Sequence, residues 1–533
     1  MKITPQKINL FVLILAIIIR GFSEYLIADL PTDKTFQITS ATHLADLKGI
    51  SLAHADSSDL AKTVYERIGL WPPGYALLVA PLLATGLDWF SAALIIDILA
   101  VCLFFISWHL IFYSIREHIP PYFPSVVFLY WAFAISPFRH LYSTDLIALS
   151  FCSLGFLGLI KAMKYLEKLS FPYILLTSFT FFSSSLFHYG FYSVSISFPL
   201  ILILFAYIKN KSLIKPAFYS LIGTVVFIIL QMAYLKFYVG DAYYLNEYHP
   251  NPLENFHFYN LKKFDPFVVN SFFDSHLVNR YLGSFQSSVF TIVFSLLIFF
   301  ILALSFAREL FYNKIRDWTI KHWFYLSGLI IVVMKILLLV VLSLRYPPEY
   351  NGWSYVGEPR YFSVAFLFLP LFLIFFTMNR KEKWQRINAV FCNLIIGLAI
   401  VFSSIVNIFL LKKYSLYTPI ANTCKYYHYS KELYSFIEES VFIKQKETIV
   451  FCNAQDNYIN ELFLMEGLKT IDFNQLPTEI KTSRDIKILI ALDDNSRKEA
   501  SLFLKNHKSR KLLSLKDLNA EIWEVSIQKN IQK

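Results

Sequence analysis

Long apolar runs separated by short polar stretches dominate the chain. A helix needs about 20 mainly apolar residues to cross a bilayer, and eleven runs reach or approach this length. They are residues 8–28, 90–113, 120–137, 143–160, 172–189, 191–208, 216–238, 287–307, 322–343, 361–379 and 388–411. The pattern predicts an all-α polytopic membrane protein with about 11 transmembrane helices.

Composition supports this class. Only 16% of the 533 residues are charged, against about 25% in soluble globular domains. The first apolar run continues into Arg20-Gly21-Phe22 without a small-residue cleavage site, so we expect an uncleaved span rather than a signal peptide. The net charge of +11 comes from basic residues between the apolar runs, which argues against nucleic-acid binding.

The order of basic residues predicts the topology, because loops on the cytoplasmic side are enriched in Lys and Arg. All basic groups fall on the cytoplasmic side if the N-terminus is cytoplasmic and residues 74–86 do not cross the membrane. We therefore expect the stretch WPPGY, residues 71–75, to open a helix lying along the membrane surface. The basic groups are Lys2 and Lys7, Arg116, 161–168, 209–215, 308–321 and 380–386.

The same topology places two large loops, 29–89 and 240–286, on the outer side, together with everything after residue 411. The last 120 residues or so change character: β-branched runs at 447–454, 469–476, 486–494 and 520–527 alternate with helical patterns at 457–467 and 496–507. We expect a transmembrane domain, 1–411, and a small extracytoplasmic α/β domain, 412–533. The latter has no Gly-rich phosphate loop, so a docking or lid role is expected. A disulfide between Cys424 and Cys452 is left open.

Acidic residues follow the first span directly, at Asp29, Asp33 and Asp46. Carboxylates near the hydrocarbon boundary are costly unless they are solvated, paired or used. One interpretation is structural, with Thr32 or Asp33 capping a surface helix. The other is a general base that acts on an acceptor hydroxyl at the membrane surface. The sequence alone leaves both open.

An acid just after the first span, a helix ending at Gly49 and the WPPGY stretch opening an apolar helix together resemble the GT-C superfamily of membrane glycosyltransferases. Within it, the pattern is similar to the branch of protein O-mannosyltransferases and bacterial aminoarabinose transferases. The resemblance implies a GT-C-like core in the lipid bilayer and a polyprenyl-phosphate sugar donor. It also implies transfer on the outer side, to a glycan, lipid or protein acceptor. The Lys-, Phe- and Ile-rich composition suggests a bacterial inner membrane.

The resemblance also implies catalytic carboxylates. Asp33 with Phe36 has the family's spacing of an acid and an aromatic residue, which makes Asp33 the first candidate for the base. Many relatives carry two adjacent acids where this chain has Lys34 after Asp33, so Asp29 stays an alternative. A divalent cation as cofactor also stays open, and no metal ligand is assigned. Asp145, in the stretch STDLIAL, matches an acid at the outer end of the fourth span.

Departure of the carrier phosphate demands positive charge near the developing anion, and arginine binds two phosphate oxygens at once. Arg360 and Tyr361 match a late Arg-Tyr motif of the family and are the first candidates for holding the donor phosphate. Arg139 is a further candidate, as is His188, which stands where relatives carry arginine. Arg345 is a weaker one. The alternative for the arginines is snorkelling at helix ends.

Three rival functions remain. A transporter or flippase of lipid-linked sugars would place ionisable residues within spans, where this chain has mainly Arg20, Asp97 and Lys335. An O-antigen polymerase or ligase would lack the WPPGY helix. A catalytically inactive scaffold would fit the departures at Lys34 and His188. The acids gathered in the outer loops favour an inverting glycosyltransferase, for which one carboxylate base suffices.

Overall fold

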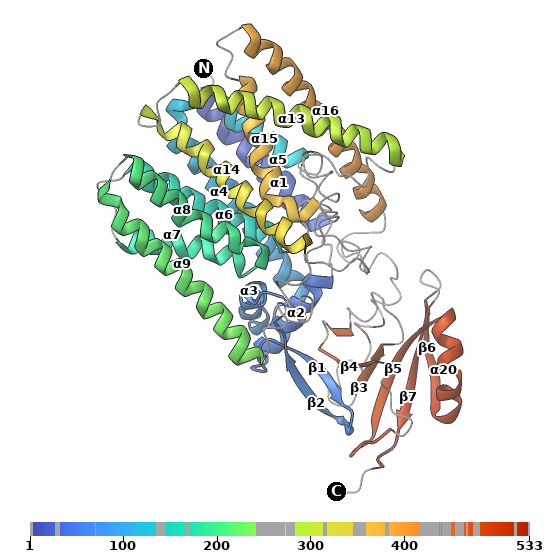
Figure 1. Ribbon diagram of the computed structural model, residues 1–533. Coiled ribbons are helices and arrows are strands. Elements are labelled where there is room, and N and C mark those ends of the chain that lie inside the picture. Colours follow the sequence, from blue (N-terminus) through green and yellow to red (C-terminus); the bar gives the residue numbers. More distant parts are fainter. Residues whose placement is uncertain are drawn as a thin grey trace. The chain divides into compact units, whose positions relative to one another are not determined.

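The computed structural model (Figure 1) is predominantly helical, with one sheet. It describes residues 4–26, 32–69, 71–134, 144–165, 171–209, 211–240, 272, 283–312, 317–344, 359–378, 383–415, 436, 439, 449–453, 463–464, 467–472, 480–515 and 520–530.

The chain divides into two compact units. The first, called the helical unit, comprises Met1–Glu24 and Asp97–Leu410; the second, called the sheet unit, comprises Tyr25–Ile96 and Leu411–Lys533. Each unit is therefore built from two separate stretches of the chain. The boundaries fall inside the first helix, the fourth helix and the last long helix of the apolar region.

Every apolar run predicted to span the membrane contains a helix. The helices are α1 (Pro5–Leu26), α4 (Trp89–Ser114), α5 (Phe123–Phe133), α6 (Asp145–Lys164), α7 (Phe171–Ser185), α8 (Tyr192–Lys209), α9 (Ile214–Tyr234), α13 (Ser284–Tyr312), α14 (Ile320–Leu344), α15 (Ser363–Met378) and α16 (Lys383–Ser415). Short helical turns are η1 (Arg116–His118), η3 (Tyr189–Phe191), η4 (Lys211–Leu213), the π-turn η5 (Leu235–Val239) and η8 (Pro359–Phe362).

Six of the helices in the described part of the chain are long and apolar enough to cross a membrane. They include α1, α4, α6, α8, α9 and α14, some extended by a flanking turn. The described apolar segments of α5, α13, α15 and α16 are shorter, so the expected number of eleven spans stays a prediction.

An aromatic cluster around Trp108 fixes the packing of the helical unit. The Trp108 ring on α4 lies 5.1 Å from Trp131 on α5 and 5.7 Å from Phe156 on α6. It also lies 5.7 Å from Phe368 on α15. Because the indole is fully buried, its N–H needs an acceptor, and it donates to the Ser153 hydroxyl at 2.9 Å. One side chain thereby joins four helices.

The sheet unit contains a seven-stranded mixed sheet in the order β2-β1-β4-β3-β5-β7-β6. Its strands are β1 (Ser51–Asp56), β2 (Asp59–Arg67), β3 (Ile449–Asn453), β4 (Lys469–Asp472), β5 (Ile486–Asp493), β6 (Lys508–Leu515) and β7 (Ala520–Ile527). Strands β1, β4, β3 and β5 run parallel to their neighbours in the middle, and both ends are closed by antiparallel pairs. The alternation along β5 puts Ile486, Ile488 and Ile490 into one buried core.

Strands β3, β4, β5 and β7 agree with the predicted ones, and α20 (Asp494–Asn506) agrees with the predicted helix 496–507. Strand β6 and the hairpin β1–β2 were not expected. The hairpin belongs to the first loop, yet β1 pairs in parallel with β4, with His54 opposite Thr470. The sheet is thus not confined to residues 412–533, as the sequence-based division has it. Leu60 and Ala61 of the hairpin complete its core, since both are buried in it.

Two short helices complete the sheet unit: α2 (Thr32–Ala45) and α3 (Gly74–Ala84). Helix α3 has 11 residues, about half of what a transmembrane helix needs, in agreement with a helix that does not cross. Pro73 precedes it with φ −76°, the angle to which a proline ring is fixed. Its position at the membrane surface stays a prediction.

Candidate functional site

In the helical unit, polar side chains gather around the N-terminus of α6. Asp145 is the first residue of that helix and is 1% exposed. A carboxylate is stabilised there by the positive end of the helix dipole. The preceding residue, Thr144, donates a hydrogen bond from its hydroxyl to the Phe187 carbonyl at 2.8 Å. This bond fixes the start of α6 to the segment that carries His188.

His188 lies in the turn between α7 and α8, where it caps η3. Its Nδ1 accepts a hydrogen bond from the Gly190 N–H at 3.0 Å. An imidazole nitrogen that accepts carries no proton, so the proton of the neutral ring is on Nε2. That nitrogen lies 3.7 Å from the Asp145 carboxylate, a separation that suits charge attraction and is too long for a hydrogen bond.

Lys335 adds a cation from the middle of α14. It is 2% exposed, and its Nζ donates to the Gly190 carbonyl at 2.9 Å while lying 4.7 Å from the centre of the Phe191 ring. The ammonium also interacts with the charge of Asp145. A buried cation is tolerated when it is hydrogen-bonded and close to an opposite charge; Lys335 has the hydrogen bond to Gly190 and the attraction of Asp145. We call Asp145, His188, Gly190 and Lys335 the polar cluster.

Gly190 has no room for a side chain. A Cβ there would lie 2.5 Å from the Lys335 Nζ and 2.8 Å from the His188 ring. The backbone N–H and C=O of this one residue bind the histidine and the lysine respectively. The glycine of the stretch HYG is therefore the centre of the polar cluster.

Tyr361 borders the polar cluster from η8. It is buried, and its ring meets the His188 ring edge-on with the centroids 5.8 Å apart. Arg360 precedes it in the same turn, but its side chain lies outside the described part of the structure. Sequence reasoning thus named three residues that the fold brings together: Asp145, His188 and Tyr361.

Sequence reasoning missed Lys335 as a site residue. The only signal was a lysine in an apolar stretch of α14, one of the few charges within the predicted spans. Its partner is a backbone carbonyl 145 residues away, and no local pattern indicates such a contact.

The first-loop residues of the resemblance belong to the sheet unit. Asp33 is the second residue of α2, and its side chain is outside the described part. The helix that carries it is anchored by Phe36, whose ring stacks on Trp71 of the WPPGY stretch with the centroids 4.4 Å apart. Lys34 lies with its Nζ 5.7 Å from the centre of the Tyr75 ring. The motif residues around Asp33 therefore pack against each other.

The remaining candidates, Asp29, Arg139 and Arg345, lie outside the described residues, as does Cys424. Within the described ranges, no three His, Cys, Asp or Glu side chains come together in a way that could hold a metal ion. The divalent cation that the sequence leaves open, with no ligand assigned, stays open.

No family model matches the chain, and no curated protein matches it in sequence. Solved structures do match in fold. The apo crystal structure of ArnT from Cupriavidus metallidurans has a TM-score of 0.51 and 11% identity, with 97% of each chain covered. ArnT bound to undecaprenyl phosphate gives 0.49 and 10% identity over the same shares.

The chain shares the fold of ArnT. This agrees with the resemblance of the first-loop motifs, and with the apolar helices it supports an integral membrane protein. A further match is the oligosaccharyltransferase AglB from Archaeoglobus fulgidus, solved with an inhibitory peptide and a dolichol-phosphate, with a TM-score of 0.43 and 12% identity. That alignment covers 89% of this chain but only 65% of AglB.

Proposed function

We propose that the chain is a membrane glycosyltransferase that moves a sugar from a polyprenyl-phosphate carrier to an acceptor hydroxyl or amine. The observation that carries the proposal is the fold shared with ArnT along 97% of both chains. Since one fold hosts many functions, the polar cluster supplies support from a site. Ionisable side chains buried among apolar helices are costly and mark functional positions. The neighbour ArnT itself binds undecaprenyl phosphate.

In this proposal, cations of the helical unit bind the donor phosphate. Lys335 supplies a buried ammonium 2.9 Å from the Gly190 carbonyl, and Arg360 with Tyr361 follows in η8. Arg139 and His188 complete the set. As the glycosidic C–O bond breaks, the phosphate leaves with the bonding electrons, and its second negative charge develops beside these groups. Preorganised positive charge stabilises such an anion most where water is excluded.

Asp33 is the proposed base, with Asp29 as the alternative. Its carboxylate takes the proton of the acceptor hydroxyl, while the acceptor oxygen forms the new bond to the anomeric carbon. The carbon inverts because the attacking oxygen and the leaving phosphate are on opposite faces. A single displacement of this kind needs one carboxylate, which the stacked α2–α3 pair with Phe36 and Trp71 would hold in position.

Asp145 is proposed as a positioning residue. Its carboxylate attracts the Nε2–H of His188 at 3.7 Å and offsets the charge of Lys335. Without it, the ammonium would be left in an apolar surrounding. The carboxylate thereby keeps two donor-binding groups in place, and its proposed effect on catalysis is through them.

The test is a transfer assay on the purified protein with a labelled polyprenyl-phosphate sugar. Asp33→Asn should lower the rate by about 10²–10⁴-fold, the usual contribution of a general base. Asp56→Asn, in the turn of the hairpin, is the matched control and should keep the rate. If Asp33→Asn and Asp29→Asn both transfer at the full rate, the assignment of the base to these residues is wrong.

A transporter of lipid-linked sugars is the second candidate, favoured by Lys335 within α14 and by Arg20, which is buried in α1 and lies 3.6 Å from Glu24. Detergent micelles separate the two functions, since they offer no second compartment. Product formation in micelles supports the transferase. No product there, together with movement of the lipid-linked sugar across proteoliposomes, would support the transporter.

We assign the chain to the aminoarabinose-transferase-like branch within this proposal. We place it in a bacterial inner membrane, with a cytoplasmic N-terminus and an outward-facing C-terminal region. The accessibility of the introduced cysteines in Lys498→Cys and Arg116→Cys variants to a thiol label in inverted vesicles checks this orientation. The two labels should be found on opposite sides.

A further inference from the structure

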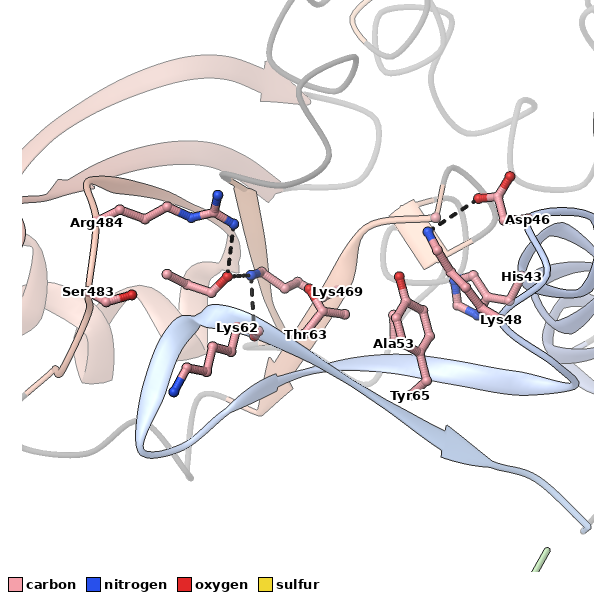
Figure 2. A pocket seen from close by; sticks show the side chains of 12 residues that line it. His43, Asp46, Lys48, Ala53, Lys62, Thr63, Tyr65, Lys469, Ser483 and Arg484 are labelled. Atoms are coloured by element: carbon pink, nitrogen blue, oxygen red, sulfur yellow. Dashed lines mark hydrogen bonds and ion pairs between the residues drawn. The ribbon is translucent and has the colours of Figure 1, made fainter. Parts of the chain in front are cut away.

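A cavity of about 620 Å³ lies inside the sheet unit, a size that suits a small molecule or a short part of a larger one. It opens between the hairpin β1–β2, strand β4 and the residues just before β5 (Figure 2). Among the residues that line it, only Ala53, Ala61 and Gly467 lack a polar or aromatic side chain. Because an acyl chain gains free energy by contact with apolar surface, this lining does not suit the tail of a lipid.

The walls of this cavity are fixed by bonds between the hairpin and the C-terminal strands. The Leu60 N–H donates to the Lys481 carbonyl at 3.0 Å, and the Asp59 carboxylate accepts from the Ser483 N–H at 2.9 Å. Burial favours protonation of Asp59, but the hydrogen bonds from Ser483 and Ala61 outweigh it and lower its pKa. Asp59 is therefore ionised at neutral pH and holds the hairpin to the C-terminal strands.

The cations at one end of the cavity belong to the same walls. The Lys469 ammonium donates to the Ala61 carbonyl at 2.8 Å, and the Arg484 guanidinium donates to the same oxygen at 3.1 Å. Lys62 lies 3.8 Å from the Asp59 carboxylate. These contacts tie β4 and the residues before β5 to the hairpin, so this end of the cavity is a structural joint.

The other end of the cavity combines an aromatic ring with charged groups. Figure 2 shows Tyr65, His43, Lys48 and Asp46 together there. Tyr65 is partly exposed, and the Lys48 Nζ lies 5.2 Å from the centre of its ring. The Asp46 side chain is 52% exposed and lies 3.5 Å from the Lys48 Nζ. Since a carboxylate has about four acceptor sites, Asp46 can accept further hydrogen bonds from a ligand.

This combination matches the two kinds of surface that a sugar ring presents. The C–H groups of a sugar form an apolar face that can lie against a tyrosine ring, and the hydroxyl groups at its edge both donate and accept hydrogen bonds. Asp46 accepts such bonds and Lys48 donates them. An aromatic wall with a few polar groups that fix orientation is typical of ligand sites, and here it favours a saccharide.

Helix α2 connects this end of the cavity with the proposed base. Asp33 is the second residue of α2, His43 is in its last turn, and Asp46 follows its end. From Asp33 to His43 the helix rises by about 15 Å, at 1.5 Å per residue. The His43 Nδ1 donates to the Ser51 carbonyl at 2.7 Å, which fixes the end of the helix to β1. The fold of the sheet unit thus sets the separation, which exceeds the size of one sugar ring.

We propose that the acceptor is a glycan of several sugar units. One unit lies against Tyr65 with its hydroxyl groups bonded to Asp46 and Lys48, while the hydroxyl that receives the new sugar reaches Asp33. This inference rests on the proposed transfer reaction and selects the glycan from the glycan, lipid and protein acceptors. No covalent bond forms or breaks in the cavity, which contributes binding and sets the distance to the base.

The first test is binding of the full chain in detergent micelles to an array of bacterial surface oligosaccharides of increasing length. Their constituent monosaccharides, unglycosylated peptides and phospholipids are the other probes. A set of related oligosaccharides should bind tenfold or more tightly than the monosaccharides that compose them. Binding of peptides or phospholipids without binding of any oligosaccharide would overturn the proposal.

Variants at the aromatic end locate the glycan. Tyr65→Ala and Asp46→Asn should each lower the affinity for the preferred oligosaccharide about tenfold, whereas Tyr65→Phe keeps the ring and should bind nearly as the parent does. Lys498→Gln removes an exposed cation on α20, outside the cavity lining, and is the control. An unchanged affinity in both Tyr65→Ala and Asp46→Asn, with unfolding temperatures equal to that of the parent, would overturn the proposal.

Kinetics separate this inference from the transfer reaction itself. With the preferred oligosaccharide as acceptor, Tyr65→Ala should raise the KM for the glycan about tenfold and leave both kcat and the KM for the lipid-linked donor unchanged, since it removes binding alone. Transfer to a glycan with the same KM in Tyr65→Ala and parent would contradict the cavity and leave the transferase standing. Glycan binding without transfer by the parent would contradict the transferase, and with it the acceptor role of the glycan.

Discussion

Two lysines, one in each unit, have similar burial and hydrogen bonding but different surroundings. Lys335 and Lys469 are both 2% exposed, and each donates to a backbone carbonyl, at 2.9 and 2.8 Å respectively. One charged neighbour of each lysine distinguishes them. Lys335 lies near the carboxylate of Asp145, whereas Lys469 shares its acceptor with the guanidinium of Arg484. The first arrangement brings an opposite charge near a buried ammonium, and the second brings a like charge near one.

The largest expected effect separates these two arrangements. Lys335→Met or Asp145→Asn should each lower the free energy of unfolding by about 3–5 kcal/mol, since each takes an opposite charge away from a buried charged group. The double variant should lose less than the sum of the two. Denaturation in mixed micelles measures the unfolding free energy of the parent, the two single variants and the double variant. Lys321→Met, on the same helix, is the control. Additive losses would mean that the two charges do not interact.

The second effect concerns the centre of the polar cluster. Gly190→Ala places a Cβ 2.5 Å from the Lys335 Nζ, so the lysine and the histidine must move. We expect a loss of about 1–3 kcal/mol in unfolding free energy, as for other overpacked sites, and slower sugar transfer. Gly397→Ala is the matched control, because no atom lies within 4 Å of the added carbon. Equal behaviour of both variants would contradict the crowding at Gly190.

The third effect concerns the carboxylate that ties the hairpin to the sheet. Asp59→Asn should cost about 1.5 kcal/mol at neutral pH, the low end for hydrogen bonds to a charged group. Because hydrogen bonds lower the pKa of Asp59 in the folded state below its ordinary 3.8, its contribution is present above that pH. It is lost as the pH falls from about 4 through the folded pKa. Hydrogen exchange of the hairpin amides between pH 3 and 6 measures this, and a flat profile for the parent would contradict it.

The smallest effect is expected at Lys469 itself. Lys469→Met removes a hydrogen bond to Ala61 but also removes one of two adjacent like charges. We expect the unfolding free energy to change by less than about 1 kcal/mol, in contrast to Lys335→Met. A loss as large as that at Lys335 would show that the two lysines have the same structural role, and would remove the contrast between the units.

The sequence predicted local features well and long-range pairings poorly. Each apolar run forms a helix. A helix makes its backbone hydrogen bonds within one segment, so its formation depends little on residues far away in the sequence. Strand β5 was evident from its apolar and β-branched composition, typical of a strand. The hairpin β1–β2 was not, since SLAHAD pairs on one side with DLAKTVYER and on the other with a strand more than 400 residues later. The site shows the same contrast. Asp145, His188 and Tyr361 lie in recognisable sequence motifs, whereas Lys335 is recognised as a site residue only through its contact with Gly190.

The bond between Lys469 and Ala61 joins residues 408 positions apart, and this has a consequence for biogenesis. At a synthesis rate of about 5–20 residues per second, roughly 20–80 s pass between the emergence of the two partners from the ribosome. All the helices between them are made in that interval. During it, Leu60 and Ala61 have no sheet to cover them, so the hairpin can bury these side chains only after the last strands have been made.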